Sequence, residues 1–461
     1  MSFIAKTASA CGRVARPAGV GLLLLALHAG TPGQGLPALM RQALGSDPAV
    51  AGAAAQLRAA LERVQQARGS FGPTAQLSAN YTDNRYREAP EFDLRPFNGQ
   101  QAVLQITQPI LRGTLWPALQ GARHQSHQAE AALAQAQSEV VQRLVEAVFE
   151  LLKARDAVGL VQAQQVSTAE QLALARRAHQ VGTAPLTDVR DAEARADAVA
   201  AQAIASSAEL TLRQQTLVEL AGAGTETLLG RGLDGQRVPV IDPASVLVWL
   251  SDAATGSPQI AQAQWALQMA EAEILKARLG HAPSADLSYT LSLSKDTGTV
   301  TSPLARRGDN SAIALNVTVP LFASGVTQSR VRETLALRDK AQSDLDLARR
   351  TVGLAVRQAF TGTLSAVAQA QGLEAAVRSQ ELALRVSRRA YEVGTKANAD
   401  VLDAQSKLFD ARRDLSRARY EAWNNFIKLK SQSGQLGEAD LTHLDAQLVD
   451  WRSEPMLTPR R

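Results

Sequence analysis

The chain contains one long pattern twice. Val181-Gly182-Thr183 is repeated as Val393-Gly394-Thr395, 212 residues later. Other landmarks return after 210 or 211 residues, namely Pro48 as Pro258, Pro73 as Pro283 and Pro109 as Pro320. Solenoid repeats have periods of roughly 20 to 50 residues, so this period is too long for a solenoid. We therefore interpret the chain as a tandem duplication of one folding unit, and any function must explain why two copies are present.

The repeat divides the chain into five parts: a signal segment at 1–35, a first repeat at 36–221, a linker at 222–244, a second repeat at 245–432 and a tail at 433–461. Three cations in the signal segment, Lys6, Arg13 and Arg16, precede the apolar run of residues 20–27, which is typical of a cleaved secretion signal. The single cysteine, Cys11, lies before this run, whereas a lipid-anchoring cysteine would follow it. The mature chain is therefore expected to have neither a thiol nor a lipid anchor.

Composition narrows the class of protein. The formal charge is +5, and removing the three cations of the signal segment, which contains no acids, leaves +5 − 3 = +2. Lysine and arginine are interspersed with aspartate and glutamate, a pattern typical of solvated helix faces, so nucleic-acid binding is not predicted. Aromatic residues make up only 4% of the chain, which favours long helices packed closely through small side chains. After the signal segment no run of 18 apolar residues occurs, so a helical membrane protein is not predicted.

Each repeat is expected to contain three helices. Opening helices are predicted at about 36–68 and 245–279, long helices at 114–180 and 326–392, and returning helices at 186–221 and 398–431. Residues Leu144, Leu151, Val158 and Leu172 share a seven-residue spacing, which indicates coiled-coil packing. In each repeat the opening and returning helices together match the length of the long helix. We therefore expect them to stack end to end beside it, with the linker lying as a belt where they meet.

A β-hairpin follows each opening helix, at 74–108 and at 284–320. From Ala75 and from Ala285 apolar and polar residues alternate over roughly ten positions, which is the signature of transmembrane β-strands. A small soluble sheet with one face on a core is the alternative interpretation. Four strands cannot close a barrel, which needs about eight, but several copies of the chain could close one together.

The turns between long and returning helices, at 181–187 and 393–399, form the two tips. Gly182 and Gly394 suit the left-handed position that ends a helix, while Thr183 and Thr395 are expected to cap the next helix. Each turn is followed by two acids three positions apart, which places both on one helix face: Asp188 with Asp191, and Asp400 with Asp403. Two interpretations stay open, since acids near a helix start are favoured by its dipole, and carboxylates could also ring a narrow pore mouth.

The tip motifs resemble those of a known family. Residues 389–396 (Arg-Ala-Tyr-Glu-Val-Gly-Thr-Lys), then Asp400-Val-Leu-Asp403, are similar to the second tip of the TolC-like outer-membrane channels, including their toxin-secretion branch. Residues 181–183 resemble the first tip, and Gln108-Pro-Ile110 resembles the junctions between strand and helix. The resemblance implies a mainly α fold with a small transmembrane β part. It also implies a homotrimer, in which a twelve-stranded barrel in outer-membrane lipid continues into a twelve-helix periplasmic tunnel.

The resemblance also implies roles for individual residues. Asp400 and Asp403 resemble the family's constriction acids, while Tyr391 and Lys396 resemble groups that bind across to Asp188 and hold the entrance closed. The best-known family member has arginine where Lys396 stands, and an ammonium group cannot make the bidentate contact of a guanidinium. The expected contacts to adaptor and transporter are the tip residues Val181, Gly182, Thr183, Val393, Gly394 and Thr395.

No enzymatic chemistry is predicted. The stretch Gly230-Arg-Gly232-Leu-Asp-Gly235 matches a dinucleotide-binding pattern in its letters only, because no strand is predicted before it and Pro239 follows soon after. His124, His127 and Glu130 lack the HExxH spacing of a zinc site. The acid pairs have no accompanying catalytic histidine, cysteine or serine, so neither a cofactor nor a metal is expected.

These observations favour an outer-membrane exit duct, passive in itself, that serves an inner-membrane transporter, either ABC-type or proton-driven, through a periplasmic adaptor. Without a lipid-anchor cysteine, type I protein (toxin) secretion is the preferred cargo route and multidrug efflux is the alternative. A periplasmic adaptor or a soluble coiled-coil scaffold is more remote, because an adaptor needs a single helical hairpin and a scaffold needs neither alternating strands nor a secretion signal.

Overall fold

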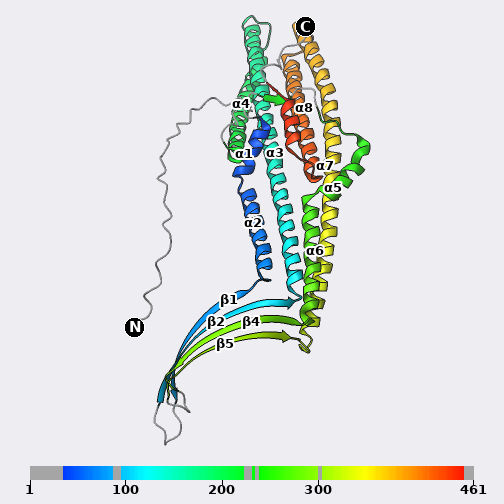
Figure 1. Cartoon of the computed structure of the whole chain (residues 1–461). Helices are drawn as coiled ribbons and strands as arrows, with labels where there is room; N and C mark the ends of the chain where they lie inside the picture. The colour runs from blue at the N-terminus through cyan, green and yellow to red at the C-terminus, as the bar shows by residue number, and fades with distance from the viewer. Residues whose placement is uncertain (1–34, 87–94, 223–230, 234–237, 299–303, 451–461) are drawn as a thin grey trace.

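The computed structural model describes residues 35–86, 95–222, 231–233, 238–298 and 304–450. In this part of the chain a long column of helices stands on a curved four-stranded sheet, and the tips of two helical hairpins lie at the end of the column farthest from the sheet (Figure 1). The predicted signal segment, 1–35, lies outside the described residues except for Gly35, which precedes the first helix.

The elements follow the duplication. The first repeat contains α1 (Leu36–Ser46), α2 (Pro48–Gly69), β1 (Thr74–Tyr86), β2 (Arg95–Arg112), α3 (Leu115–Gln180) and α4 (Leu186–Ala221). The second contains η2 (Pro243–Ser245), α5 (Val246–Gly256), α6 (Pro258–Arg278), η3 (Leu279–His281), β4 (Ser284–Asp296), β5 (Arg306–Thr318), α7 (Val326–Glu392) and α8 (Asn398–Gln432). Between the repeats lies β3 (Arg231–Leu233), and after them come α9 (Glu438–Gln447) and β6 (Leu448–Asp450).

The two long helices were correctly predicted. α3 has 66 residues and α7 has 67, so at 1.5 Å per residue each is about 100 Å long. Pro117 lies in the first turn of α3, where the backbone has no hydrogen-bond partner to lose. None of the described helices combines the length and the hydropathy that crossing a bilayer requires.

The prediction of one opening helix per repeat was wrong. The helix breaks between α1 and α2 at Asp47 and between α5 and α6 at Ser257, and both residues have extended backbone with ψ of 125° and 120°. Each break precedes a proline, Pro48 or Pro258, which disfavours helical geometry in the residue before it. At the first break the Asp47 carboxylate accepts a hydrogen bond from Ala49 N at 2.8 Å, which starts the new helix.

The breaks change the predicted stacking. α2 packs beside the sheet-proximal part of α3 and α4 beside its tip-proximal part, so these two short helices do follow one another along the long one. The ion pairs Arg143–Asp47 (2.8 Å) and Arg213–Glu150 (3.8 Å) mark the two levels. α1 is a separate piece that packs against α3, α4 and α9 near the junction.

The largest core cluster lies at this junction. Leu144, Leu152, Leu217, Ile427 and Leu444 are almost fully buried and come from α3, α4, α8 and α9. β3, which lies in the linker, pairs with β6 of the tail. We call this junction, where the cluster of buried residues lies, the waist of the helical column. Full burial of one such aliphatic side chain contributes about 1.5–3 kcal/mol, so the waist is the best-stabilised level of the column.

A buried polar network ties the waist together. Asp156 on α3 accepts hydrogen bonds from Tyr420 Oη (2.7 Å) and Ser416 Oγ (3.2 Å) on α8. Its neighbour Arg155 pairs with the same carboxylate at 2.5 Å and donates to the carbonyl oxygen of Arg231 on β3. The Arg231 guanidinium then pairs with Asp445 on α9 at 2.7 Å. This network connects α8 to α3, to the linker and to the tail, and α3 and the linker are both more than 150 residues away from α8 in sequence.

The sheet is fully antiparallel, in the order β1-β2-β4-β5. Its register aligns apolar residues in cross-strand rows on one face, for example Leu77, Leu104 and Leu291, and the alternate positions such as Gln76, Gln105 and Thr290 form a polar face. β2 continues past the predicted end at 108 to Arg112, with a register shift between Pro109 and Leu111. β1 and β5 are both edge strands, and β5 is exposed along its whole length.

Candidate functional site at the hairpin tips

Both tips are closed by the same backbone motif. Gly182 and Gly394 have φ of 76° and 80°, the left-handed region that glycine adopts without strain. In the first tip Thr183 N donates to Ala178 O at 2.9 Å and Gly182 N to His179 O at 3.0 Å. These two bonds form a Schellman motif, and the second tip repeats it with Thr395 N and Gly394 N as donors.

The prediction that the threonines cap the following helices was wrong. Thr183 Oγ1 donates to Ala178 O at 3.0 Å, and Thr395 Oγ1 donates to Ala390 O at the same distance. Both hydroxyls therefore close the preceding helix, since the Schellman turn brings its last carbonyls within reach. The valines of the motif are left exposed, Val181 by 74% and Val393 by 76%. Each tip thus presents an apolar side chain at the far end of the column.

The two acids of the second tip both have local partners. Asp400 Oδ2 accepts a hydrogen bond from Ala397 N at 3.2 Å, which is the role of an acid in the first turn of a helix. Asp403 forms an ion pair with Lys407 at 2.7 Å, and both side chains are exposed. Hydrogen bonding to Asp403 and the charge of its carboxylate raise the pKa of Lys407. These contacts support the helix-start interpretation for Asp400 and show that a nearby cation offsets the charge of Asp403.

The residues expected to form a latch are not joined within one chain. Lys396 Nζ donates to Ser387 Oγ at 3.3 Å, inside its own hairpin. Tyr391 is half-buried and packs on the apolar cluster of Leu384, Val401 and Leu408. Asp188 lies in the first turn of α4, and no hydrogen bond or ion pair among the described residues connects it to Tyr391 or Lys396. A contact between these groups would have to form between neighbouring chains.

The two hairpins of one chain contact each other through α8. Leu402 of α8 is buried against Ala175, Val189 and Ala192 of the first hairpin. One turn further along, Gln405 is only 1% exposed, and neither its amide nitrogen nor its amide oxygen has a hydrogen-bond partner. The site therefore contains a buried polar group that the sequence analysis missed.

The duplication shows how Gln405 differs from its counterpart. The equivalent residue in the first repeat is Glu193, which pairs with Arg176 and Arg190 at 2.8 Å each. Hydrogen bonds from these two arginines lower the pKa of Glu193. In the second repeat Leu402 stands at the position of Arg190, so the ion pair is replaced by an apolar contact and a neutral amide. A comparison of the repeats position by position would have singled out this residue.

The remaining sequence motifs do not assemble a chemical site. His124 stacks on Trp265 with ring centroids 5.7 Å apart, and His127 lies tilted against the same ring at 4.7 Å. Burial is the main cause that lowers the pKa of His124. His127 Nδ1 lies 2.9 Å from Glu130 Oε2, but no group of three metal-capable side chains occurs in the described ranges. Of the dinucleotide-like motif at 230–235, the described part forms β3, and Gly230, Asp234 and Gly235 lie outside it.

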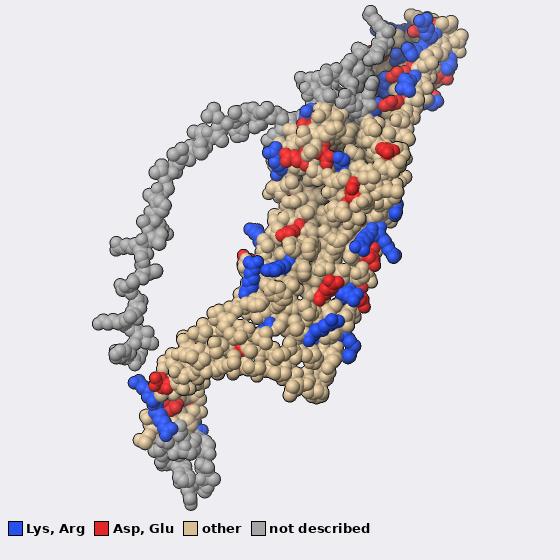
Figure 2. All heavy atoms as spheres, turned by 45° about the vertical axis from the view of Figure 1, so that its right-hand side comes forward, with Lys and Arg blue, Asp and Glu red and all other residues tan. Residues whose placement is uncertain are grey.

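The surface charges are distributed differently over the helical column and over the sheet. Figure 2 shows basic and acidic side chains interspersed along the helical column, whereas the middle of the sheet is almost uncharged in this view and charges reappear at its far end. Alternating ion pairs such as Arg412–Glu381 and Arg419–Glu374 join α8 to α7 along the column. In this view the charged side chains are thus concentrated on the helical column, and the middle of the sheet presents an uncharged surface.

Comparisons with known proteins agree with this architecture. A family model described as outer membrane efflux protein matches residues 39–223 and 249–435. The outer membrane protein TolC of Vibrio cholerae is 30% identical over 420 residues, which cover 90% of this chain and 94% of TolC. The proteases secretion protein PrtF of Dickeya chrysanthemi is 27% identical over 409 residues, covering 85% of this chain and 88% of PrtF. The crystal structure of the outer membrane protein VceC from Vibrio cholerae matches with a TM-score of 0.72 at 20% identity, over 87% of this chain and 96% of that one.

Proposed function

The chain belongs to the outer membrane efflux protein family and lies in the outer membrane with an extension into the periplasm, and on this premise we propose that it is the exit duct of a tripartite export system. It conducts substrate passively, and an inner-membrane transporter with its periplasmic adaptor provides the driving force. We assign no catalytic step to it. The observation that supports the proposal best is the direct continuation of a two-faced sheet, one face apolar and one polar, into helices about 100 Å long.

We propose that the working form is a trimer. One chain has four strands with two open edges, β1 and β5, and about eight strands are needed to close a barrel. Three copies supply twelve strands. Their helices supply twelve helical rods, if two short helices that follow one another along a long helix count as one rod. Exposed apolar side chains on α4 and α7, among them Ile204, Leu212, Leu347 and Leu354, are suited to contacts between neighbouring rods. Mass measurement of the detergent-solubilised protein tests this, since a stable water-soluble monomer would rule the duct out.

Type I protein secretion is the preferred cargo route. The similarity to PrtF, whose name describes a proteases secretion protein, supports it, and the family description as an efflux protein favours drug efflux as the alternative. Deleting the gene separates the two. Loss of specific proteins from the culture medium with unchanged antibiotic sensitivity supports secretion, and the reverse result supports efflux.

We propose that the tips form the gate. Tyr391 and Lys396 of one chain would bind Asp188 of its neighbour. These groups are exposed or half-exposed, and within one chain neither Tyr391 nor Lys396 is joined to Asp188. Lys396→Ala and Asp188→Ala are each expected to raise single-channel conductance in a planar bilayer. Arg413→Ala, an exposed cation farther along α8, is the control. Unchanged conductance in both tip variants would eliminate the latch, although the duct itself would stand. The exposed valine, glycine and threonine of each tip are the proposed contacts to adaptor and transporter.

A further inference from the structure

The apolar face of the sheet ends in a pair of like charges. Lys295 of β4 lies directly opposite Arg307 of β5 in the antiparallel register. Directly opposite residues project from the same face, and alternation along β4 places Lys295 on the face of Tyr289, Leu291 and Leu293. Like charges in this position repel one another and destabilise a sheet. The arrangement therefore calls for a partner that neutralises the pair.

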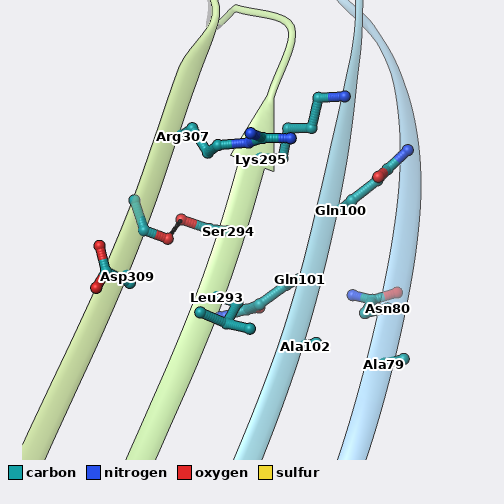
Figure 3. A pocket seen from close by; sticks show the side chains of 11 residues that line it. Ala79, Asn80, Gln100, Gln101, Ala102, Leu293, Ser294, Lys295, Arg307 and Asp309 are labelled. Atoms are coloured by element: carbon teal, nitrogen blue, oxygen red, sulfur yellow. Dashed lines mark hydrogen bonds between the residues drawn. The ribbon is translucent and has the colours of Figure 1, made fainter. Parts of the chain in front are cut away.

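No acidic side chain among the described residues neutralises it. Both cations are exposed, and neither forms an ion pair in the part of the chain that the structure describes. Asp309, two positions from Arg307 on the same strand face, is the nearest acid in register. Figure 3 shows its carboxylate at the outer side of β5, while the Arg307 side chain extends the other way, toward Lys295. On β1 the nearby Asp83 is already paired with Arg85, at 3.6 Å.

The two cations line a groove at this end of the sheet, to which residues of the polar face, Asn80, Gln101 and Ser294, also contribute. The groove has a volume of about 620 Å³, and the small side chains of Ala79 and Ala102 are part of its lining. Gln100, Leu293, Lys295, Arg307 and Asp309 all line it (Figure 3). Such a volume is in the range that holds a small-molecule head group. The lining combines the hydrogen-bond donors of Gln100, Lys295 and Arg307 with the apolar side chain of Leu293.

The position along the strands fits the border of a bilayer. From Lys295 back to Ala285 the strand advances by ten residues, which is roughly 33 Å along the strand. If the strands are tilted by about 40° from the barrel axis, this length spans about 25 Å along the membrane normal. This is the height of the apolar band on outer-membrane barrels. At the helical end of the band the aromatic side chains of Phe71, Trp116 and Phe322 are exposed, as in an interfacial aromatic belt. Because the helices extend into the periplasm, Lys295 and Arg307 lie at the outer leaflet.

We propose that Lys295 and Arg307 bind the phosphate of a phosphorylated lipid head group in the outer leaflet, with its acyl chains on the apolar rows below. The inference rests on the proposed function, since it requires the sheet to cross the outer membrane. Arginine supplies a planar fork of donors that matches phosphate geometry, and lysine supplies a compact second charge. The ligand removes the repulsion between the two cations, so binding stabilises the sheet.

The test uses the full mature chain in neutral detergent with two probes, diphosphorylated lipid A and the same lipid with its phosphates removed. Lipid A is expected to raise the thermal midpoint of the wild-type assembly, because a ligand of the folded state stabilises it. The double variant Lys295→Gln, Arg307→Gln should bind lipid A at least about tenfold more weakly by native mass spectrometry. Arg306→Gln is the matched control. It removes a cation one position away, on the polar face and opposite Asp296, and should bind as the wild type does.

Lys295→Gln alone has a second signature. In neutral detergent without lipid it should raise the thermal midpoint, because it removes the like-charge pair, and in lipid A it should lower the midpoint relative to the wild type. Equal binding by the double variant, or equal stabilisation by the dephosphorylated lipid, would overturn the proposal. Single-channel recordings on the same preparations keep the two ideas apart. Variants that insert and conduct but bind lipid A normally contradict the phosphate site alone, whereas chains that never insert contradict the proposed duct.

Discussion

At the scale of single residues, local partners decide what an acid at the tip contributes. Asp400 and Asp403 were selected from sequence because they share a helix face, and the structure leaves both exposed. The partners of the two acids differ, since Asp400 accepts from a backbone amide and Asp403 is paired with Lys407. Lys407 lies four positions after Asp403, a spacing visible in the sequence. An acid ring at a pore mouth must therefore be judged together with the cations one turn away.

This pairing predicts opposite effects on ion selectivity. Lys407→Gln frees the Asp403 carboxylate and should increase the preference of the channel for cations, whereas Asp403→Asn should decrease it. Both shifts should be larger at about 0.01 M salt than at 0.1 M, where screening acts within about 10 Å. Reversal potentials across a salt gradient measure this, with Lys428→Gln, at the waist end of α8, as the control. Identical reversal potentials in all variants would show that neither group faces the conducting path.

The pKa of His124 predicts a pH-dependent stability. Burial against Trp265 and the nearby His127 lower this pKa below its ordinary value of 6.5, although Glu271 acts in the opposite sense. As the pH falls through 6.5 the unfolded chain binds the proton first, so the folded state loses stability below that pH and regains it above. The thermal midpoint should fall by up to about 2 °C more in the wild type than in His124→Gln between about pH 7.5 and 5.5. His281→Gln, at an exposed position, should keep the wild-type slope.

At the scale of helices and strands, sequence reasoning succeeded where the pattern is local. The long helices and the glycine turns follow from periodicity and from left-handed geometry, both properties of a few adjacent residues. The break at Asp47 was missed although Pro48 signals it, because proline is also tolerated in the first turn of a helix and the apolar pattern continues across it. The hydroxyl of Thr183 was assigned to the wrong helix, since a turn offers it carbonyls before and amides after. Gln405 was missed because its burial and its lack of hydrogen-bond partners depend on tertiary packing, which the local pattern of α8 does not show.

Gln405 predicts that the contact between the two hairpins is under-stabilised. A buried amide without partners costs about 1–3 kcal/mol, and an opening movement that exposed Gln405 to water would remove that cost. Gln405→Leu should therefore stabilise the packed hairpins and lower the frequency of channel opening in bilayer recordings. Ser406→Ala, at the next and less buried position, is the control. More frequent opening of the Gln405→Leu channel would contradict this role.

The waist network holds α8 in place at one point, so an opening movement of the tips has to end there. Tyr420 and Ser416 hold α8 to Asp156 of α3, and Arg155 extends the connection to β3. Between Asn398 and Ser416, α8 contacts the first hairpin through one small apolar cluster around Leu402. Movement of the second hairpin is therefore expected to be confined to the part of α8 on the tip side of the network, and the sheet need not move.

At the scale of the whole molecule, the faces of the sheet decide how the chain meets the membrane. Leu291 and Ser292 are adjacent on β4, near the middle of the apolar band, and project from opposite faces. If the apolar face contacts lipid, an arginine in place of Leu291 costs about 2–4 kcal/mol near the bilayer midplane, whereas Ser292→Arg places the same charge on the polar, lumen-side face. Leu291→Arg should therefore reduce the amount of assembled protein in outer-membrane fractions several-fold. Ser292→Arg should assemble normally and lower the conductance for cations. Both variants carry the same new side chain, so a non-specific effect of arginine on folding would affect them alike. Normal assembly of Leu291→Arg, together with a loss of Ser292→Arg, would mean that the polar face is the one turned to lipid, and the proposed duct would then lack a polar lumen.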